Sequence, residues 1–256
     1  MNYLIVIEYC GKNYNGWQVQ NGALAPARNK TVENEILKAI KIITKLDVKL
    51  FVSGRTDTGV HAFNQVANFK LPFYYDLNRF KIALNGILPR DISVKNIEIV
   101  HNSFHATHDV VSKTYLYKIN FGFRSPLLSD GSWFIKEELN INLIKESANI
   151  FLGRNNFFNF VKRDKGKRFI NYYRVITAIE ICPKNYGFDI FIEGEGFLRH
   201  MVRRIVGSLI LCGTGKININ VLKDMLKGEN HTYNTICAPS RGLFLYSVRY
   251  GHKIYC

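Results

Sequence analysis

The sequence predicts an α+β fold of two ferredoxin-like or RRM-like halves, each an antiparallel sheet with helices on its outer face. Three observations predict it. Strand and helix signals in the first part of the chain follow the order βαββαβ, which is the ferredoxin-like arrangement. The rest of the chain again intersperses strands with helices. Hydrophobic residues make up 47% of the 256 residues, enough for a sizeable core. We therefore expect two domains, 1–102 and 103–256.

Four strand signals and two helix signals make up the first half. Strands are expected where β-branched and aromatic residues cluster, at 3–9, 48–52, 65–71 and 92–100. Thr31 is a typical N-cap, and Glu33 and Glu35 follow in the first turn, where the helix dipole favours acidic side chains. Apolar residues then recur at helical spacing up to Ile43, which predicts a helix. A second helix is expected at 77–84.

The second half contains a wide apolar helical stripe. Apolar residues recur at helical spacing from Phe197 to Leu209, so this face of the helix must be buried. Arg199 and Arg203 stand four residues apart on another face of the same expected helix. Two stacked arginines repel each other unless an anion, such as a phosphate or a carboxylate, lies beside them. Further strands are expected at 112–119, 173–181, 188–193 and 238–250, and further helices at 139–152 and 217–227.

The charge of the chain favours a polyanionic partner. The formal net charge is +15 and the pI is about 9.6, which suits nucleic acid or an anionic membrane surface. No uninterrupted apolar run approaches the roughly 20 residues that a membrane span needs, so we favour nucleic acid and expect no membrane partner. A basic stretch at 162–168 is either a solvated surface loop or a contact for backbone phosphates.

The five cysteines argue against a disulfide framework or a structural zinc site. They are scattered, odd in number and form no C-x-x-C pair. This pattern is typical of a reducing compartment. The apolar N-terminal stretch is too short for a secretory signal. We therefore expect a cytoplasmic protein without a metal site.

One polar stretch, 53–62, places an arginine, a carboxylate and a histidine around two glycines. Gly54 and Gly59 favour a tight, shaped loop after an apolar strand, and such a loop can present one carboxylate. Arg55 and Asp57 share a face in extended backbone, so the guanidinium could hold the carboxylate ionised. The simpler interpretation is a hairpin-like turn with a surface ion pair.

The stretch at 54–61 reads Gly-Arg-Thr-Asp-Thr-Gly-Val-His and resembles the signature loop of the bacterial tRNA pseudouridine synthase A family. Other motifs that resemble this family lie in order along the chain, at 9–18, 85–92, 104–106, 196–207 and 238–250. The resemblance therefore covers nearly the whole sequence. Trp17, in the first of these motifs, is either a core anchor or an RNA-facing aromatic residue. Two positions depart from the family pattern, since Cys10 replaces an aspartate and Thr107 replaces an arginine.

The resemblance implies a fold and a reaction. The fold is that of pseudouridine synthases, with an active-site cleft between the two halves. The reaction is the isomerisation of uridine to pseudouridine in tRNA, at positions 38, 39 and 40 of the anticodon stem-loop. This isomerisation needs no metal ion and no organic cofactor. The resemblance also implies a homodimer that contacts tRNA with both subunits.

The resemblance further assigns a catalytic role to four residues that are far apart in the sequence. Asp57 is expected to be the nucleophile, and Arg55 and Arg203 are expected to flank it and favour its charged form. Tyr115 is expected to stack on the uracil, where its hydroxyl could help remove the C5 proton. A tyrosine on a strand is ordinarily a core residue, which is the simpler interpretation of Tyr115.

Substrate-binding residues are expected to accompany Tyr115. An apolar side chain of the last strand is expected to pack against the target base, and Leu245 or Leu243 could supply it. Core packing explains either leucine equally well. Arg199 and His61 complete the expected substrate-binding set.

Two other functions stay open at this point. A pseudouridine synthase that modifies uridines elsewhere in RNA would account for the departure from the family pattern at Thr107. A non-catalytic RNA-binding protein would account for the charge and the sheets, but it gives no reason for a carboxylate between arginines.

Overall fold

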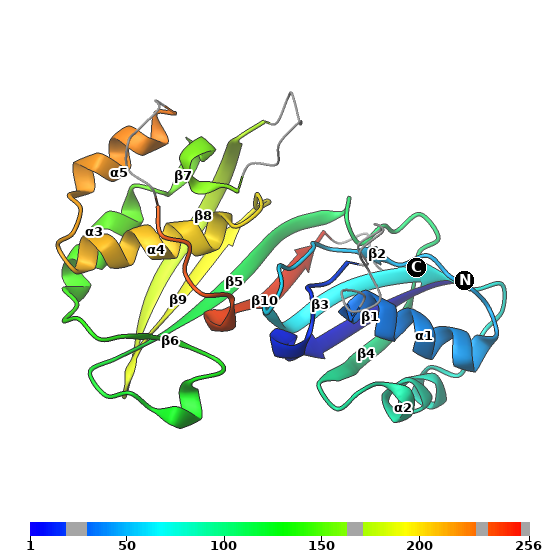
Figure 1. The fold of residues 1–256 in the computed structure, drawn as a ribbon. Helices are drawn as coiled ribbons and strands as arrows, with labels where there is room; N and C mark the ends of the chain where they lie inside the picture. Colours follow the sequence, from blue (N-terminus) through cyan, green and yellow to red (C-terminus); the bar gives the residue numbers. More distant parts are fainter. Residues whose placement is uncertain (19–29, 163–170, 229–234, 252–256) are drawn as a thin grey trace, which may run out of the picture. The chain divides into compact units, whose positions relative to one another are not determined.

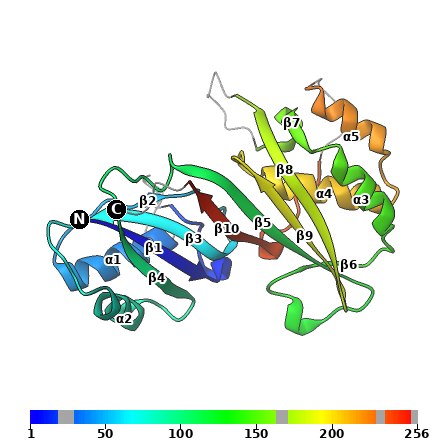
Figure 2. The same ribbon diagram turned by 180° about the vertical axis from the view of Figure 1, so that it is seen from behind.

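The computed structural model describes residues 1–18, 30–162, 171–228 and 235–251 (Figures 1 and 2). Contacts within the chain divide it into two compact units. The first unit comprises Met1–Lys113 together with Phe244–Cys256, and the second comprises Thr114–Leu243. The basic stretch that was predicted as a surface loop or phosphate contact lies, from residue 163 onwards, outside the described residues.

The first unit is built on an antiparallel sheet in the order β4-β1-β3, with β10 added along β3. The strands are β1 (Asn2–Tyr9), β2 (Phe51–Val52), β3 (His61–Lys70), β4 (Ile92–Val100) and β10 (Leu243–Tyr250). One edge of β3 is shared, because its later residues pair antiparallel with β2 and its first residues pair in parallel with β10. Helices α1 (Val32–Thr44) and α2 (Leu77–Ile87) lie on the same side of this sheet (Figures 1 and 2). The predicted βαββαβ order is confirmed, and the last strand of the chain is added to it.

Side-chain caps fix where both helices of the first unit begin. The hydroxyl of Thr31 accepts a hydrogen bond from the backbone N–H of Asn34, so the predicted N-cap is confirmed. Asp76 caps α2 in the same way. This second helix continues to Ile87, beyond the predicted end, and Leu88 is extended, as expected for a residue that precedes a proline.

A hydrophobic cluster explains why the first unit extends past the predicted boundary near Asn102. Phe104 and Ala106 are buried against Leu4 of β1 and Val66 of β3. Residues beyond the predicted boundary therefore complete the core of the first sheet, and the contacts divide the chain after Lys113, within the next strand.

The second unit has a sheet in the order β5-β9-β8-β7, with β6 parallel to β5. Its strands are β5 (Val110–Phe121), which begins in the first unit, β6 (Trp133–Ile135), β7 (Gly153–Asn156), β8 (Tyr173–Lys184) and β9 (Gly187–Gly194). Its helices are α3 (Ile141–Asn149), α4 (Met201–Gly213) and α5 (Ile219–Leu226), and α3 and α4 lie on the same side of β8 and β9 (Figures 1 and 2). Apart from the short strands β6 and β7 and the last helix α5, the elements of this unit follow the order βαββα. The predicted α+β fold class is confirmed.

Several elements begin at other residues than the sequence predicts. The strand expected at 48–52 starts only at Phe51, and the strand expected at 238–250 starts at Leu243. Two further shifts bear directly on the candidate site. The strand expected from Gln65 starts at His61, so the end of the signature stretch is already part of β3. The apolar stripe predicts that α4 starts near Phe197, but the helix starts at Met201. The preceding residue, His200, has a φ of 64°, a left-handed conformation that ends the irregular segment before the helix.

None of the helices in the described ranges is both long and apolar enough to cross a membrane.

Candidate active site

The signature loop, residues 53–60, connects β2 to β3 in the first unit. Hydrogen bonds from Ser53 to Gln65 (2.6 Å) and from Gln65 to the carbonyl of Gly54 (2.9 Å) tie its start to β3. A turn then forms in which the carbonyl of Asp57 accepts from the N–H of Val60. The loop is thus fastened on both sides of the carboxylate, and the Asp57 residue is half-buried.

Residues near the N-terminus hold the signature loop from the other side. The carbonyl of Thr56 accepts from the N–H of Trp17 (3.2 Å), and its hydroxyl is 2.7 Å from that of Tyr9. The N–H of Gly59 donates to the carbonyl of Tyr14. Trp17 is fully buried, so the structure supports its interpretation as a core anchor. The loop backbone on both sides of Asp57 is therefore fixed by the segment that follows β1.

Glycine is required where this segment touches the signature loop. Gly16 has a φ of +89°, and a Cβ there would lie 2.7 Å from the carbonyl oxygen of Thr56 and 3.2 Å from the backbone carbon of Asp57. A Cβ on Gly11 would lie 1.9 Å from the carbonyl oxygen of Val60. Side chains at either position would push the loop away, which gives a physical reason for both glycines.

His61 has a buried position at the start of β3. Its Nδ1 accepts a hydrogen bond from the N–H of Gly11 (3.2 Å), and its ring stacks on Phe244 with centroids 4.6 Å apart. His61 therefore joins three segments of the first unit. The predicted contact between His61 and the substrate stays a prediction.

The two candidate leucines at the start of β10 are also buried. Leu245 lies opposite Ala62 in the parallel register, and its exposed fraction is 0%. Leu243 is exposed by 5%. These positions agree with core packing, which the sequence left open as the alternative. Contact of either leucine with a base stays a prediction.

In the second unit, Tyr115 lies on β5 with only 8% of its surface exposed. Its ring meets the ring of Phe197 edge to face, with centroids 5.1 Å apart. Tyr117 lies on the same face of the strand, is fully buried and donates a hydrogen bond to the carbonyl of Pro239 (2.8 Å). Tyr117 is thus a packing residue, and burial raises the pKa of its hydroxyl far above the usual value.

Arg203 lies in the first turn of α4 and is fixed by residues 235–239, which we call the α4 strap. The Nε of Arg203 donates to the carbonyl of Ala238 (2.7 Å), and the Arg203 carbonyl accepts from the N–H of Ala238 (3.1 Å). Arg204 donates to both the carbonyl and the hydroxyl of Thr235. A Cβ on Gly207 would lie 1.9 Å from the carbonyl oxygen of Ile236, so the strap lies directly against the helix.

The expected helical pair of Arg199 and Arg203 is wrong. Arg199 is exposed and lies in the turn before α4, because the helix starts only at Met201. The two arginines are therefore not successive positions on one helical face. A role for Arg199 in substrate binding stays a prediction that no longer rests on this pairing.

Lys113 is a residue near the signature loop to which the sequence analysis gave no role. Its Nζ would be 2.7 Å from a Cβ on Gly54, so the lysine side chain lies over the loop where that glycine leaves room. Burial lowers the pKa of the Lys113 ammonium. Its position on a strand with alternating residues gave no local signal, because the contact joins residues that are distant in the sequence.

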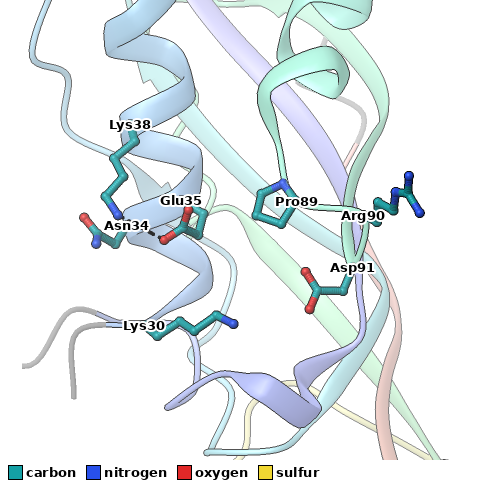
Figure 3. Close-up of a pocket in the computed structure, with 7 residues that line it drawn as sticks. All are labelled: Lys30, Asn34, Glu35, Lys38, Pro89, Arg90 and Asp91. Atoms are coloured by element: carbon teal, nitrogen blue, oxygen red, sulfur yellow. Dashed lines mark hydrogen bonds and ion pairs between the residues drawn. The ribbon is translucent and has the colours of Figure 1, made fainter. Parts of the chain in front are cut away.

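A hollow of about 540 Å³ lies at the N-terminal end of α1, beside the turn between α2 and β4 (Figure 3). It is lined by Lys30, Asn34, Glu35, Lys38, Pro89, Arg90 and Asp91. Both signs of charge are present, and Lys38 pairs with Glu35 at 3.1 Å. The hollow contains none of the predicted site residues. Within the described ranges, no three His, Cys, Asp or Glu side chains are grouped so that they could hold a metal ion.

Known proteins resemble this chain over almost its full length. A family described as tRNA pseudouridine synthase matches residues 148–251. The chain is 35% identical to "tRNA pseudouridine synthase A 1" of Protochlamydia amoebophila, covering 99% of this chain and 98% of that protein. It is 40% identical to "tRNA pseudouridine synthase A" of Thermoanaerobacter sp., covering 97% and 99%. It is 38% identical to "tRNA pseudouridine synthase A 2" of Clostridium tetani, covering 97% and 98%.

A solved structure shows a much weaker likeness. A chain from the "Crystal Structure of a Cbf5-Nop10-Gar1 Complex" matches with a TM-score of 0.34 and 13% identity, over 81% of this chain and 54% of that one. This likeness is too low to support an argument.

Proposed function

Because the chain belongs to the tRNA pseudouridine synthase A family, we propose that it isomerises uridine to pseudouridine at positions 38, 39 and 40 of the tRNA anticodon stem-loop. The observation that carries the proposal is the fixed signature loop of the first unit. Hydrogen bonds from Trp17 to Thr56 and from Val60 to Asp57 hold its backbone around one carboxylate. A carboxylate held in this way suits a reaction that needs a positioned nucleophile.

The reaction breaks two bonds and forms two. The glycosidic bond between N1 of uracil and C1′ of ribose breaks, the base turns, and a bond from C5 to C1′ forms. The proton on C5 is lost and N1 gains a proton, so there is no redox change. A uridine in a stem must first leave the base stack, because the enzyme cannot reach its atoms within a duplex. We assign the nucleophile to Asp57, which attacks either C1′ of the sugar or C6 of the base.

Three further residues act on the same uridine in this proposal. Arg203 favours the charged form of Asp57, and its bond to Ala238 supports this role by fixing the direction of the guanidinium. Arg55, which is exposed, occupies the space that the target base leaves. Tyr115 stacks on the uracil and assists removal of the C5 proton. Its small exposed fraction means that little water reaches its ring, which suits a base-stacking surface.

The substrate and the compartment follow from the same proposal. The formal net charge of +15 supports binding of the tRNA backbone, and we expect the affinity to fall steeply with salt. The cysteines among the described residues are free thiols, which suits a protein of the cytoplasm. As in the family pattern, we propose that the protein works as a homodimer, without a metal ion or an organic cofactor.

Tritium release tests the chemistry. The wild-type protein is incubated with tRNA that carries tritium at C5 of its uridines, and the released tritium is measured. We expect Asp57→Asn, which keeps the size of the side chain, to abolish release. Asp47→Asn is the control, because Asp47 is an exposed acid on the surface of the same unit. Full release by Asp57→Asn would exclude Asp57 as the nucleophile, and no release by wild type would exclude the enzyme.

Position mapping tests the substrate assignment. Pseudouridine is mapped in tRNA from cells that lack the gene, and we expect positions 38, 39 and 40 to lose the modification. Retention at all three would favour uridines elsewhere in RNA. The departure at Thr107 motivates that second candidate, although the Thr107 hydroxyl donates a hydrogen bond within the first unit, to the carbonyl of Val52 in β2 (2.7 Å). An Asp57→Ala strain without any defect would instead favour a non-catalytic RNA-binding protein.

A further inference from the structure

Lys113 places a positive charge against the backbone of the signature loop. Its Nζ, Cε and Cδ atoms would lie 2.7, 3.5 and 3.7 Å from a Cβ on Gly54, so the end of the side chain runs along the loop. Gly54 directly precedes Arg55 and lies in the same loop as Asp57. The ammonium is therefore next to the segment that carries the proposed nucleophile.

Among the residues that the structure describes, the Lys113 ammonium has no anionic partner. Across the described ranges, none of the hydrogen bonds or ion pairs includes its side chain. Other lysines, which are more exposed, do have carboxylate partners: Lys95 pairs with Glu8 at 3.2 Å, and Lys216 pairs with Glu137 at 2.7 Å. A half-buried ammonium without a partner destabilises the folded protein, and the lowered pKa of Lys113 reflects this burial. A stabilising role is thus a poor explanation for the residue.

An anion that is present only in the complex would supply the missing partner. Burial lowers the pKa of the Lys113 ammonium, and an anion beside it would favour its charged form. Arg55 adds a second, exposed cation to the same loop. The proposed substrate carries one phosphate per nucleotide, and lysine binds phosphate as a compact point charge.

We propose that Lys113 binds a backbone phosphate of the RNA next to the target uridine, and that Gly54 lacks a side chain to leave room for this ammonium. The inference rests on the proposed function and adds a contact to it. Lys113 then fixes the strand on which the uridine turns out of the stack, while Asp57 carries out the chemistry.

Lys113→Met is the first variant of the test. Methionine ends at the atom that corresponds to Cε, so it removes the ammonium and keeps the rest of the side chain. We expect the Kd and the KM for tRNA to rise about 3- to 10-fold at fixed salt, with kcat changed less than about twofold. The slope of log Kd against log salt concentration should become shallower by about 0.7 to 0.9, the value for one phosphate contact. Lys113→Arg should restore most of the affinity, and Lys95→Met is the matched exposed control.

Gly54→Ala provides an independent variant that leaves Lys113 in place. Its methyl group takes the position of the ammonium and displaces it, which is possible because Nζ is the end of a flexible side chain. We expect a similar rise in Kd from Gly54→Ala alone. In the Lys113→Met background the same substitution should add little, because the nearest remaining atom would be about 3.5 Å away, an ordinary contact.

The outcomes separate this inference from the proposed function. No tritium release by the wild-type protein would overturn the function itself. If the wild type is active, an unchanged Kd and an unchanged salt slope for Lys113→Met overturn the phosphate contact. A weaker affinity that comes with a lower free energy of unfolding also overturns it, because removal of a half-buried charge without a partner should leave the fold at least as stable.

Discussion

Gly207→Ala tests whether the contact between α4 and the α4 strap fixes Arg203. Glycine within a helix is about 1 kcal/mol less favourable than alanine, so helix propensity alone predicts that this substitution stabilises the protein. The contact predicts the opposite. A Cβ on Gly207 would lie 1.9 Å from the carbonyl oxygen of Ile236, and the closest favourable C–H···O contacts are about 3.3 Å. Helix and strap would have to separate by roughly 1.4 Å.

The effect of this separation on the free energy of unfolding can be estimated. Overpacking of this kind costs about 1–3 kcal/mol. It also weakens the bonds of the strap to Arg203 and Arg204, each worth about 1 kcal/mol. After the gain in helix propensity, we expect Gly207→Ala to lower the free energy of unfolding by about 2 kcal/mol. Because a displacement of about 1 Å near the reaction can cost about 100-fold, kcat should fall at least about tenfold.

Gly86→Ala is the matched control. Gly86 lies in α2, and a Cβ there would meet nothing within 4 Å. This variant should gain about 0.5–1 kcal/mol and keep its kcat. Urea unfolding gives the stability of both variants, and tritium release gives their kcat. Equal stabilisation by both substitutions would refute the reasoning, since it would mean that the strap yields to the added methyl group without cost.

Three further predictions concern both units. Gly16→Ala adds a side chain at a left-handed φ and against the carbonyl of Thr56, so it should lose about 2–4 kcal/mol of stability and most of the activity. Gly122→Ala has a similar φ in open space and should lose only about 1 kcal/mol. Equal losses in urea unfolding would show that the contact with Thr56 contributes nothing. Thr56→Val leaves the buried hydroxyl of Tyr9 without its 2.7 Å partner and should cost about 1–3 kcal/mol, and an unchanged thermal midpoint would count against this bond. Burial raises the pKa of Asp189, so ionisation weakens the folded state above that pKa, and this penalty disappears as pH falls below the unfolded value. Asp189→Asn should therefore be up to about 1 kcal/mol more stable than wild type near pH 7 and equal to it near pH 3, and a variant that is less stable near pH 7 would show that the ion pair with lysine outweighs the burial.

Local signals predicted the elements whose ends depend on nearby residues. Thr31 caps α1 through a bond to an N–H three residues away, which is the range over which sequence patterns operate. The order βαββαβ followed from such signals. The start of α4 was predicted too early because the apolar stripe continues through Phe197. Only the left-handed conformation of His200, which no local pattern announced, shows where the helix begins.

The surroundings of Asp57 could be predicted only in part. The motif with its glycines marked the loop. The hydrogen bonds that hold the loop to Tyr9, Tyr14 and Trp17 could not be predicted, because these residues lie about 40 positions away in the sequence. Lys113 was missed for the same reason, because it lies in β5 whereas Gly54, which it contacts, lies in the loop between β2 and β3. The separation in sequence is what hides these contacts, since hydrophobic periodicity reports a buried face and not the element that covers it.

The position of β10 has a consequence for biosynthesis. His61 and Ala62, which end the signature stretch, are paired by Phe244 and Leu245, residues that the ribosome adds long after the rest of the first unit. At about 5–20 residues per second, this edge of β3 stays open for roughly 10 to 35 s of translation. A nascent chain can therefore form most of its first sheet early, but the strand beside the proposed nucleophile is completed last. A message cut short before the last strand would yield a protein with an open sheet edge, which favours aggregation over premature activity.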